Sequence, residues 1–400
     1  MSYLYFQPEY VSKFKCDGSK CDAKCCKYWR IYVDAPTYQK YPQDVKAHLQ
    51  FDNNYGLYLI ELDDKNVCPF LNADKLCRLQ LEHGENFLSK TCATYPRYTF
   101  SFGEFFERSL TLSCPVAAEM ILFNPNPMQF ELVEVSEKIH SQDGKIVKIK
   151  VACGEGLSQR MLETQIAMLS ILQERTLTID QRLIVLGFFM DKLEEISTGG
   201  LNEYALIKLI AAYESKQFLA EQVPLMLQTV QFNPRRFIGL MLKLFNAIYG
   251  GTDNKYIRAV ADALGIVPNK NNRVSASAIA ANYQRLEAAR HKFLNDYSTV
   301  LENYLVNELF MNCYPWRFTE SISNNCAMFL ATYKIFELIL FAATLKDLHS
   351  KGDLLKLINW FTRQKVHSLS NDFYKKIFGQ IKGDLLTLME SFLDTKRAVL

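Results

Sequence analysis

The sequence has little that would tie it to nucleic acid or to a membrane surface. Its 46 basic and 43 acidic residues leave a formal net charge of only +3 over 400 residues. So small an excess gives no general electrostatic argument for binding a polyanion or an anionic bilayer. We therefore expect no nucleic-acid partner.

Long apolar runs are also scarce. The longest that we find, residues 336–345, is interrupted by Glu337 and flanked by Lys334 and Lys346, whereas spanning a bilayer takes about 20 apolar residues. Residues 1–9 have neither the basic region nor the apolar core of a secretory signal. We therefore expect no membrane span and a cytoplasmic location, where thiols stay reduced.

Two common architectures lack their sequence signatures. No repeat of fixed period is present, and strands do not alternate with helices, which argues against a doubly wound α/β sheet. A single Gly-x-Gly occurs within residues 151–156, after a strand-like run. Without surrounding βαβ units, this motif is only a weak signal of nucleotide binding. We interpret it as the end of a β-hairpin, followed by a helix that begins near Leu157.

Cysteine, by contrast, is concentrated at one end of the chain. Eight of the 11 cysteines lie within residues 1–115, namely Cys16, Cys21, Cys25, Cys26, Cys68, Cys77, Cys92 and Cys114. A reducing compartment disfavours disulfides, and clustered thiolates suit zinc or iron–sulfur clusters. Four ligands complete one zinc site or one [4Fe–4S] cluster, so eight thiols allow two sites, or one site with four thiols left over. The residues alone leave zinc and iron open.

The first cysteine loop does not match the radical S-adenosylmethionine signature, Cys-x3-Cys-x2-Cys. Cys21 and Cys25 have the first spacing, but Cys26 follows at once. Because neighbouring side chains diverge in regular structure, Cys25 and Cys26 can serve different sites, or one of them can remain a thiol.

Other possible ligands carry less weight. His48 and His83 are isolated histidines, a pattern more typical of surface groups than of ligands. Cys153, Cys313 and Cys326 lie in later segments, and we expect them to be buried and unreactive.

The periodicity of the chain predicts an α+β fold: a small cysteine-rich N-terminal domain with short strands, followed by a mostly α-helical domain. The expected domains are 1–123, a connector with a β-hairpin at 124–156, and 157–400. In the first domain we predict a helix at 36–49, a strand at 57–62, a hairpin at 98–102 and 105–112, and a helix from 116 to 122. The connector hairpin comprises 130–135 and 145–151, around Asp143-Gly144. Helical periodicity covers 161–172, 183–196, 203–217, 234–248, 275–310, 320–348, 352–368 and 372–395.

The order and neighbours of the cysteines resemble the flagellin lysine-N-methylase family, within a wider set of cysteine-rich zinc- or iron-chelating domains. The similar segments are Phe-Lys-Cys-Asp-Gly-Ser-Lys-Cys-Asp-Ala-Lys-Cys-Cys-Lys-Tyr-Trp at 14–29, Ile-Tyr-Val-Asp at 31–34, Thr-Tyr at 37–38, Cys-Pro-Phe-Leu at 68–71, Cys77, Leu-Ser-Lys-Thr-Cys at 88–92, Tyr-Pro-Arg at 95–97 and Leu-Thr-Leu-Ser-Cys-Pro at 110–115. The helical part resembles the family more loosely, best at 307–310 and 314–317.

The resemblance implies an enzyme that transfers a methyl group from S-adenosylmethionine to lysine ε-amines of flagellin. It also implies a [4Fe–4S] cluster held by the N-terminal cysteines, with zinc as the alternative. A lysine must be neutral to attack the methyl group, so a proton acceptor or a desolvating site is needed. Tyr95, Tyr98, Asp34 and Glu107 are candidates by neighbourhood alone, and we assign no catalytic residue.

Arg97 lies between two expected ligands, Cys92 and Cys114. We predict that it binds the cofactor by pairing with its carboxylate, or that it faces the negative charge of a cluster; a surface salt bridge is the alternative. Trp29 and Trp316 can wall a lysine or adenine pocket, although a tryptophan in such contexts is more often part of the core.

Two functions of other classes remain open at this point. One is a non-catalytic zinc- or iron-binding module that docks a partner protein. The other is a carrier of metal or clusters with accessible thiolates. The metal content of protein purified without oxygen separates these functions from the enzyme.

Overall fold

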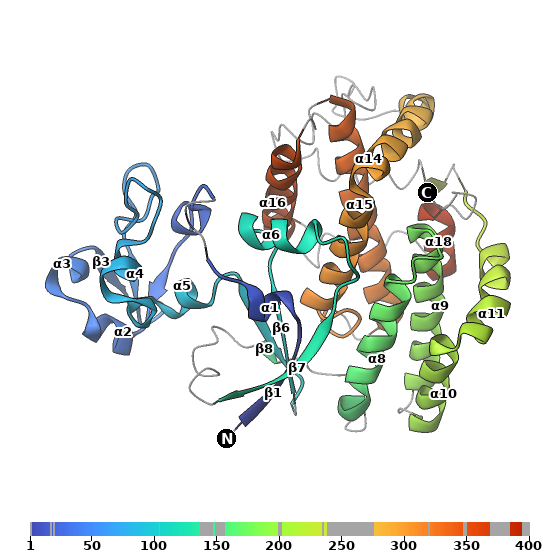
Figure 1. Ribbon diagram of the computed structural model, residues 1–400, viewed down its shortest axis with the longest axis horizontal. Coiled ribbons are helices and arrows are strands. Elements are labelled where there is room, and N and C mark those ends of the chain that lie inside the picture. Colours follow the sequence, from blue (N-terminus) through green and yellow to red (C-terminus); the bar gives the residue numbers. More distant parts are fainter. Residues whose placement is uncertain are drawn as a thin grey trace. The chain divides into compact units, whose positions relative to one another are not determined.

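The computed structural model describes residues 2–16, 18, 21–103, 105–136, 147–148, 157–198, 202–233, 236–237, 276–318, 321–346, 350–368 and 385–393. The chain folds as two compact units (Figure 1). The N-terminal unit comprises Met1–Met120 and Gln129–Lys148, and the helical unit comprises Ile121–Met128 and Ile149–Leu400. Short strands and short helices make up the first and long helices the second, so the predicted α+β class is confirmed.

A mixed five-stranded sheet runs through the N-terminal unit in the order β7-β1-β6-β5-β8. Its strands are β1 (Ser2–Pro8), β5 (Arg97–Ser101), β6 (Phe105–Leu110), β7 (Phe130–Ser136) and β8 (Val147–Lys148). Strands β5 and β6 pair antiparallel with Thr99 opposite Arg108, which confirms the predicted hairpin. Strand β1 was not predicted; it lies parallel to β6 and antiparallel to β7, and its Tyr5 and Phe6 are buried.

The second predicted hairpin is wrong. Strand β7 pairs with β1 and strand β8 pairs with β5, so the two strands lie at opposite edges of the same sheet. Val133 and Val135 of β7 pack with Tyr5 of β1 and Phe106 of β6. A turn sequence such as Asp143-Gly144 indicates only the local backbone conformation. The partner of β7 is decided by its apolar contacts with strands that are distant in sequence. The turn at Asp143-Gly144 lies outside the described residues.

The cysteine-rich part of the N-terminal unit contains a small antiparallel sheet in the order β2-β4-β3. Its elements are β2 (Tyr32–Val33), β3 (Leu49–Asp52), β4 (Leu57–Ile60), α1 (Tyr10–Lys13), η2 (Lys24–Cys26), α2 (Ala35–Lys40), α3 (Gln43–Lys46), α4 (Arg78–His83), η3 (Glu85–Phe87) and α5 (Lys90–Thr94). The predicted strand at 57–62 is confirmed as β4. The predicted helix at 36–49 is wrong, because it breaks at Tyr41, whose backbone is extended before Pro42.

The helical unit confirms most of the predicted helices. The described helices of this unit are α8 (Leu157–Leu172), α9 (Ile179–Ser197), α10 (Glu203–Glu214), α11 (Lys216–Thr229), α14 (Ala276–Met311), α15 (Ile322–Lys346), α16 (Lys351–Ser368) and α18 (Leu385–Phe392). Helix α6 (Pro115–Leu122), which was also predicted, begins in the N-terminal unit, whose first segment ends at Met120. Helix α11 was not predicted, and it contains Pro224 in its interior. The predicted helix at 234–248 lies outside the described residues apart from 236–237, as do 151–156 and Cys153.

Helix α15 forms the core of the helical unit. It packs against α9, α14, α16 and α18. By length and composition its residues Ile322–Leu345, with a mean hydropathy of 1.7, are able to cross a membrane, but the apolar stretch is buried entirely within the protein. This stretch is more than twice as long as the run that we noted at 336–345. Complete burial of so apolar a helix is the behaviour of a core helix.

Candidate metal centre and adjoining pocket

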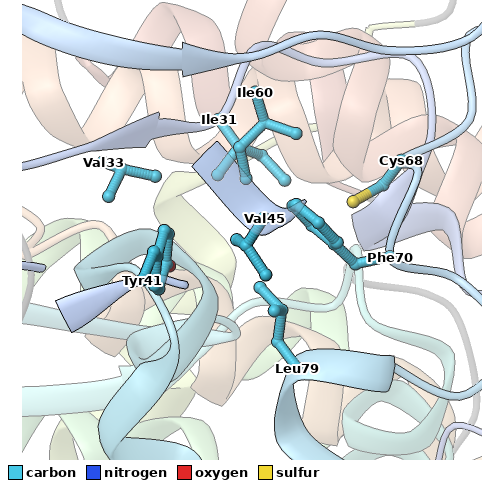
Figure 2. Packing of buried hydrophobic residues seen from close by; sticks show 8 residues of the cluster. All are labelled: Ile31, Val33, Tyr41, Val45, Ile60, Cys68, Phe70 and Leu79. Carbon is cyan, nitrogen blue, oxygen red and sulfur yellow. The ribbon is translucent and has the colours of Figure 1, made fainter. Parts of the chain in front are cut away.

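Four of the eight N-terminal cysteines gather around one small hydrophobic core. Cys68 is buried in this core beside Phe70, Leu79 and Ile60, as Figure 2 shows. Further apolar side chains that pack against it include Cys26, Cys77 and Cys92. The core therefore brings thiols from four separate segments of the chain to one place.

Main-chain contacts hold these segments in position. The N–H of Cys68 donates to the carbonyl of Cys26 at 2.8 Å, which joins the first cysteine loop to the second. Cys77 forms a β-bridge with Leu71 and is the N-cap residue of α4. Cys92 lies in α5, where its N–H donates to the Ser89 hydroxyl at 3.2 Å. The cysteine positions are thus set by caps and bridges of short elements.

Cys25 joins the same group. Its sulfur lies 3.9 Å from that of Cys26, and this hydrogen bond is the main cause that raises the pKa of Cys26. Burial raises the pKa of Cys92 to about 12, with further increases from Cys68, Cys77 and Cys25. Thiolates that raise one another's pKa are close neighbours. We call Cys25, Cys26, Cys68, Cys77 and Cys92 the thiol cluster.

Two more cysteines, Cys114 and Cys21, have a pKa that burial raises and that Cys25 raises further. Burial raises the pKa of Cys114, and Cys21 and Cys25 raise it further. Burial likewise raises the pKa of Cys21, with Cys25 among the neighbours that add to the effect. Cys16 is exposed. The sulfurs of Cys25 and Cys26 lie in contact, and Cys25 is also among the groups that raise the pKa of Cys21 and Cys114.

Several of these sulfurs accept hydrogen bonds from the main chain. The donors are N–H groups two or three residues further along: Ala23 for Cys21, Phe70 for Cys68, Gln80 and Leu79 for Cys77, and Ala117 and Val116 for Cys114. These bonds lower the pKa of the thiols, against the larger effect of burial. Hydrogen bonds to sulfur favour the thiolate and orient metal ligands, so the local backbone suits metal-binding cysteines.

The donor set fits a soft metal, because thiolates are the ligands of zinc and of iron–sulfur clusters. No group of three His, Cys, Asp or Glu side chains within the described parts of the chain is close enough to hold one ion. Binding a metal would therefore have to draw the thiols closer together. His48 packs edge-on against Phe70, and His83 stacks on Phe87, with ring centroids 5.7 and 4.6 Å apart.

A large pocket adjoins the thiol cluster. Its volume is about 1150 Å³, slightly above the roughly 300–1000 Å³ common for ligand pockets. Helix α5 belongs to both features: Lys90, Ala93 and Thr94 line the pocket, while Cys92 faces the thiol cluster. Residues three and four apart share one face of a helix, so this short helix presents one face to the pocket and its cysteine to the core.

Basic groups lie on the sheet side of this pocket. Arg97 of β5 and Arg108 of β6 both line it. The Arg97 guanidinium donates to the Phe14 carbonyl at 3.4 Å and lies over the Phe14 ring, and Arg108 lies 4.0 Å from the centre of the Tyr5 ring. Arg108 is buried. These contacts hold two permanent positive charges on the sheet.

Acidic groups line the pocket as well, from the turn before α2, from η3 and from β7 of the same sheet. Asp34, Glu85 and Glu134 line the pocket, and the two glutamates are exposed. Asp34 also caps α2, where its carboxylate accepts the N–H and hydroxyl of Thr37 at 2.9 and 3.1 Å. The pocket therefore offers guanidinium groups for an anionic end of a ligand and carboxylates for a cationic one.

The other proton-acceptor candidates lie elsewhere in the N-terminal unit. Glu107 is buried in β6, and Tyr98 is exposed on β5. Tyr95 hydrogen-bonds Ser113 at 3.1 Å and meets the ring of Trp29 edge-on, with ring centroids 5.5 Å apart. None of these three candidates is among the residues that line the pocket.

The two tryptophans and the later cysteines that the sequence analysis named differ in their exposure to solvent. Trp316, Cys313 and Cys326 are buried in the helical unit, as predicted. Trp29 is 37% exposed, so the prediction that it belongs to the core is wrong. Its indole N–H donates to the Cys25 carbonyl, which places the ring over the first cysteine loop rather than inside the core.

Sequence reasoning missed most of the polar residues that line the pocket. They are Gln7, Lys40, Glu85, Asn86, Lys90, Arg108 and Glu134. They come from segments more than a hundred residues apart, and no motif connects them. Only the pairing of β1 with β6 and β7 brings the first and last of these segments together.

Comparison with known proteins identifies the family. A model of the FliB lysine N-methylase C-terminal domain matches residues 165–392, more than half of the chain. The chain belongs to this family. The predicted family is thereby confirmed, and the match falls within the helical unit, where the resemblance of the sequence was weakest.

Three curated relatives are similar over 133 residues, or 30% of this chain. The flagellar biosynthetic protein FliU of Salmonella muenchen is 32% identical over 79% of its length. The lysine-N-methylases of Salmonella typhimurium strain LT2 and Salmonella choleraesuis strain SC-B67 are each 33% identical over 33% of their length. The alignment thus spans about a third of either methylase. No solved structure matches the chain.

Proposed function

We propose that the protein is a lysine N-methyltransferase that methylates lysine ε-amines of flagellin in the cytoplasm, with S-adenosylmethionine as the donor. Membership in the FliB family carries this proposal. The names of the relatives support it, because two are lysine-N-methylases and the third is a flagellar biosynthetic protein. The pocket beside the thiol cluster is the place that we propose for the reaction.

The thiol cluster is the proposed site of a [4Fe–4S] cluster, with zinc as the alternative. Cys68, Cys77 and Cys92, together with Cys25 or Cys26, would supply four sulfur ligands. When bound, an iron–sulfur cluster supplies electropositive iron at the wall of the pocket, whereas a closed zinc site would only hold the fold together. The hydrogen-bonded sulfurs described above support either metal.

The carboxylates that line the pocket suit a lysine substrate. A lysine amine has a pKa near 10.4 in water, so at neutral pH it arrives as an ammonium ion. Asp34, Glu85 and Glu134 would attract this cation. Methyl transfer forms a C–N bond and breaks the C–S bond of the sulfonium, and the proton lost from the amine passes to a carboxylate or to water.

Arg97 and Arg108 are the proposed partners of the cofactor carboxylate. A guanidinium pairs with a carboxylate through two parallel hydrogen bonds. We expect Arg97→Gln to weaken the binding of S-adenosylmethionine by at least about tenfold, the value of one charged hydrogen bond. Isothermal titration calorimetry of the metal-loaded protein with S-adenosylmethionine measures this loss of affinity.

Arg30→Gln is the matched control, because Arg30 is exposed and does not line the pocket. It should bind the cofactor as tightly as the wild type. Equal affinity in Arg97→Gln and the wild type would remove Arg97 from the cofactor site and leave the methylase proposal in place.

The proposal as a whole is tested by mass spectrometry of flagellin co-expressed with and without this protein. Methyl groups on lysine should appear only in its presence. If metal-loaded protein leaves every flagellin lysine unmodified, the methylase proposal fails, and a non-catalytic binding module or a metal carrier becomes the better description.

A further inference from the structure

A second pocket lies within the helical unit, between the start of α9 and the middle of α14. Its volume is about 230 Å³, less than the roughly 300 Å³ at which pockets for larger organic ligands begin. The polar side chains that line it include Arg175, Arg182, Arg290, Ser298, Thr299 and Glu302. Three guanidinium groups and one carboxylate therefore face a space that suits a small molecule or the end group of a larger one.

The single carboxylate is already fully engaged. Glu302 is 4% exposed and pairs with Arg175 at 2.8 Å and with Arg182 at 2.7 Å. Arg182 also donates to the carbonyls of Leu172 and Leu177. These contacts fix the geometry of the pocket wall and leave no lone acidic partner for the third arginine.

That third arginine is the unusual group. Arg290 is 4% exposed, and its Nε is buried without a hydrogen-bond acceptor. It forms no hydrogen bond or ion pair with any side chain in the part of the chain that the structure describes. A guanidinium is always charged and carries five donors, and a buried charge without a partner is strongly destabilising.

The charges around Arg290 do not balance either. Among the groups that surround Tyr333 together with Arg290, Asp180 and Glu337 both bind Lys334, and this trio has a net charge of −1. Arg175, Arg182 and Glu302 have a net charge of +1. Arg290 therefore leaves the whole group with one positive charge in excess.

The beginning of α9 adds to this positive character. Thr178 and Ile179, at the N-terminus of this 19-residue helix, line the pocket. The N-terminal end of a helix carries a partial positive charge and favours anions. On the other side, α14 is interrupted at Tyr297, next to Ser298 and Thr299, whose hydroxyls also line the pocket.

We propose that this pocket binds a small oxyanion of the phosphate or carboxylate class, with Arg290 as its main ligand. The planar fork of the guanidinium matches both kinds of oxyanion. The hydroxyls of Ser298 and Thr299 contribute further hydrogen bonds at the mouth, where Ser298 is exposed. One bound anion satisfies the donors of Arg290 and neutralises the excess charge.

Titration of the full-length protein with inorganic phosphate tests the proposal. Wild-type protein should bind phosphate or acetate in calorimetry, and its melting temperature should rise relative to chloride of equal ionic strength. Arg290→Gln should bind the same anion at least about tenfold more weakly. The comparison of phosphate with acetate identifies which of the two oxyanion classes fits.

Arg160→Gln is the matched control, because Arg160 pairs with Glu163 and Glu203 on the surface of the same unit. It should respond to the anion as the wild type does. If Arg290→Gln does not fold, Arg290→Lys keeps the charge but loses the fork and should still bind more weakly. Absence of any response in the wild type, or an unchanged response in the Arg290 variant that folds, overturns the proposal.

Discussion

Cys92→Ser should lower the metal affinity of the N-terminal unit by more than about tenfold, since even changes beyond the direct ligands of a metal cost 10- to 100-fold. Methylation of flagellin should fall with the metal. Cys92 is the member of the thiol cluster that α5 holds between the hydrophobic core and the pocket. A serine hydroxyl is nearly the size of the thiol but is a poor ligand for a soft metal.

The measurement is the iron and zinc content of protein purified without oxygen, together with its visible absorption. One cluster corresponds to about four irons per chain. Cys326→Ala is the control, because Cys326 is a fully buried thiol in α15 of the helical unit. It should keep the full metal content. Undiminished iron in Cys92→Ser would exclude Cys92 as a ligand, and full methylation by a metal-free variant would rule out any catalytic role of the metal.

Lys334→Met should be the most destabilising change in the helical unit. The Lys334 side chain is 2% exposed, and its Nζ lies 2.8 Å from the Asp180 carboxylate and 2.7 Å from that of Glu337. Without this lysine, the buried carboxylates of Asp180 and Glu337 lose the cation that they share. Breaking a buried ion pair from one side costs about 3–5 kcal/mol, and chemical denaturation measures the loss in the free energy of unfolding.

A surface pair provides the comparison for this effect. Lys192 and Glu195 are also three residues apart on a helix and form an ion pair of 2.6 Å, but both are more than half exposed. Lys192→Met should therefore change the free energy of unfolding by less than about 0.5 kcal/mol. Equal effects of the two substitutions would mean that Lys334 contributes no more than a surface charge.

The helices were predictable because their signal is local. Segments such as 183–196 repeat apolar residues every three or four positions, and α9 follows that pattern closely. Where local rules conflicted, the prediction failed. Pro224 interrupts the pattern of α11, yet packing of that helix against α9 and α10 retains it. At Tyr41 the local rule holds instead: its backbone is extended before Pro42, and the helix ends there.

The strands show the limit of local signals more clearly. The hairpin of β5 and β6 was predictable because Gly103, with a φ of 92°, turns the chain between two adjacent strands. The turn signal after β7 was equally good, but β7 pairs with β1, more than a hundred residues away in sequence. Choosing between such partners requires knowing which apolar faces meet, and one sequence does not contain that information.

The amino-acid order alone determined the α+β class, the family, and the eight N-terminal cysteines as the metal-ligand candidates, because periodicity and cysteine spacing are properties of short segments. The tertiary structure decided which thiols gather around Phe70, and it assembled the pocket from β5, β6, β7 and α5. It alone brought Arg290 beside the ion pairs of Glu302. Burial and charge balance depend on neighbours distant in sequence, and those neighbours are chosen only when the chain packs.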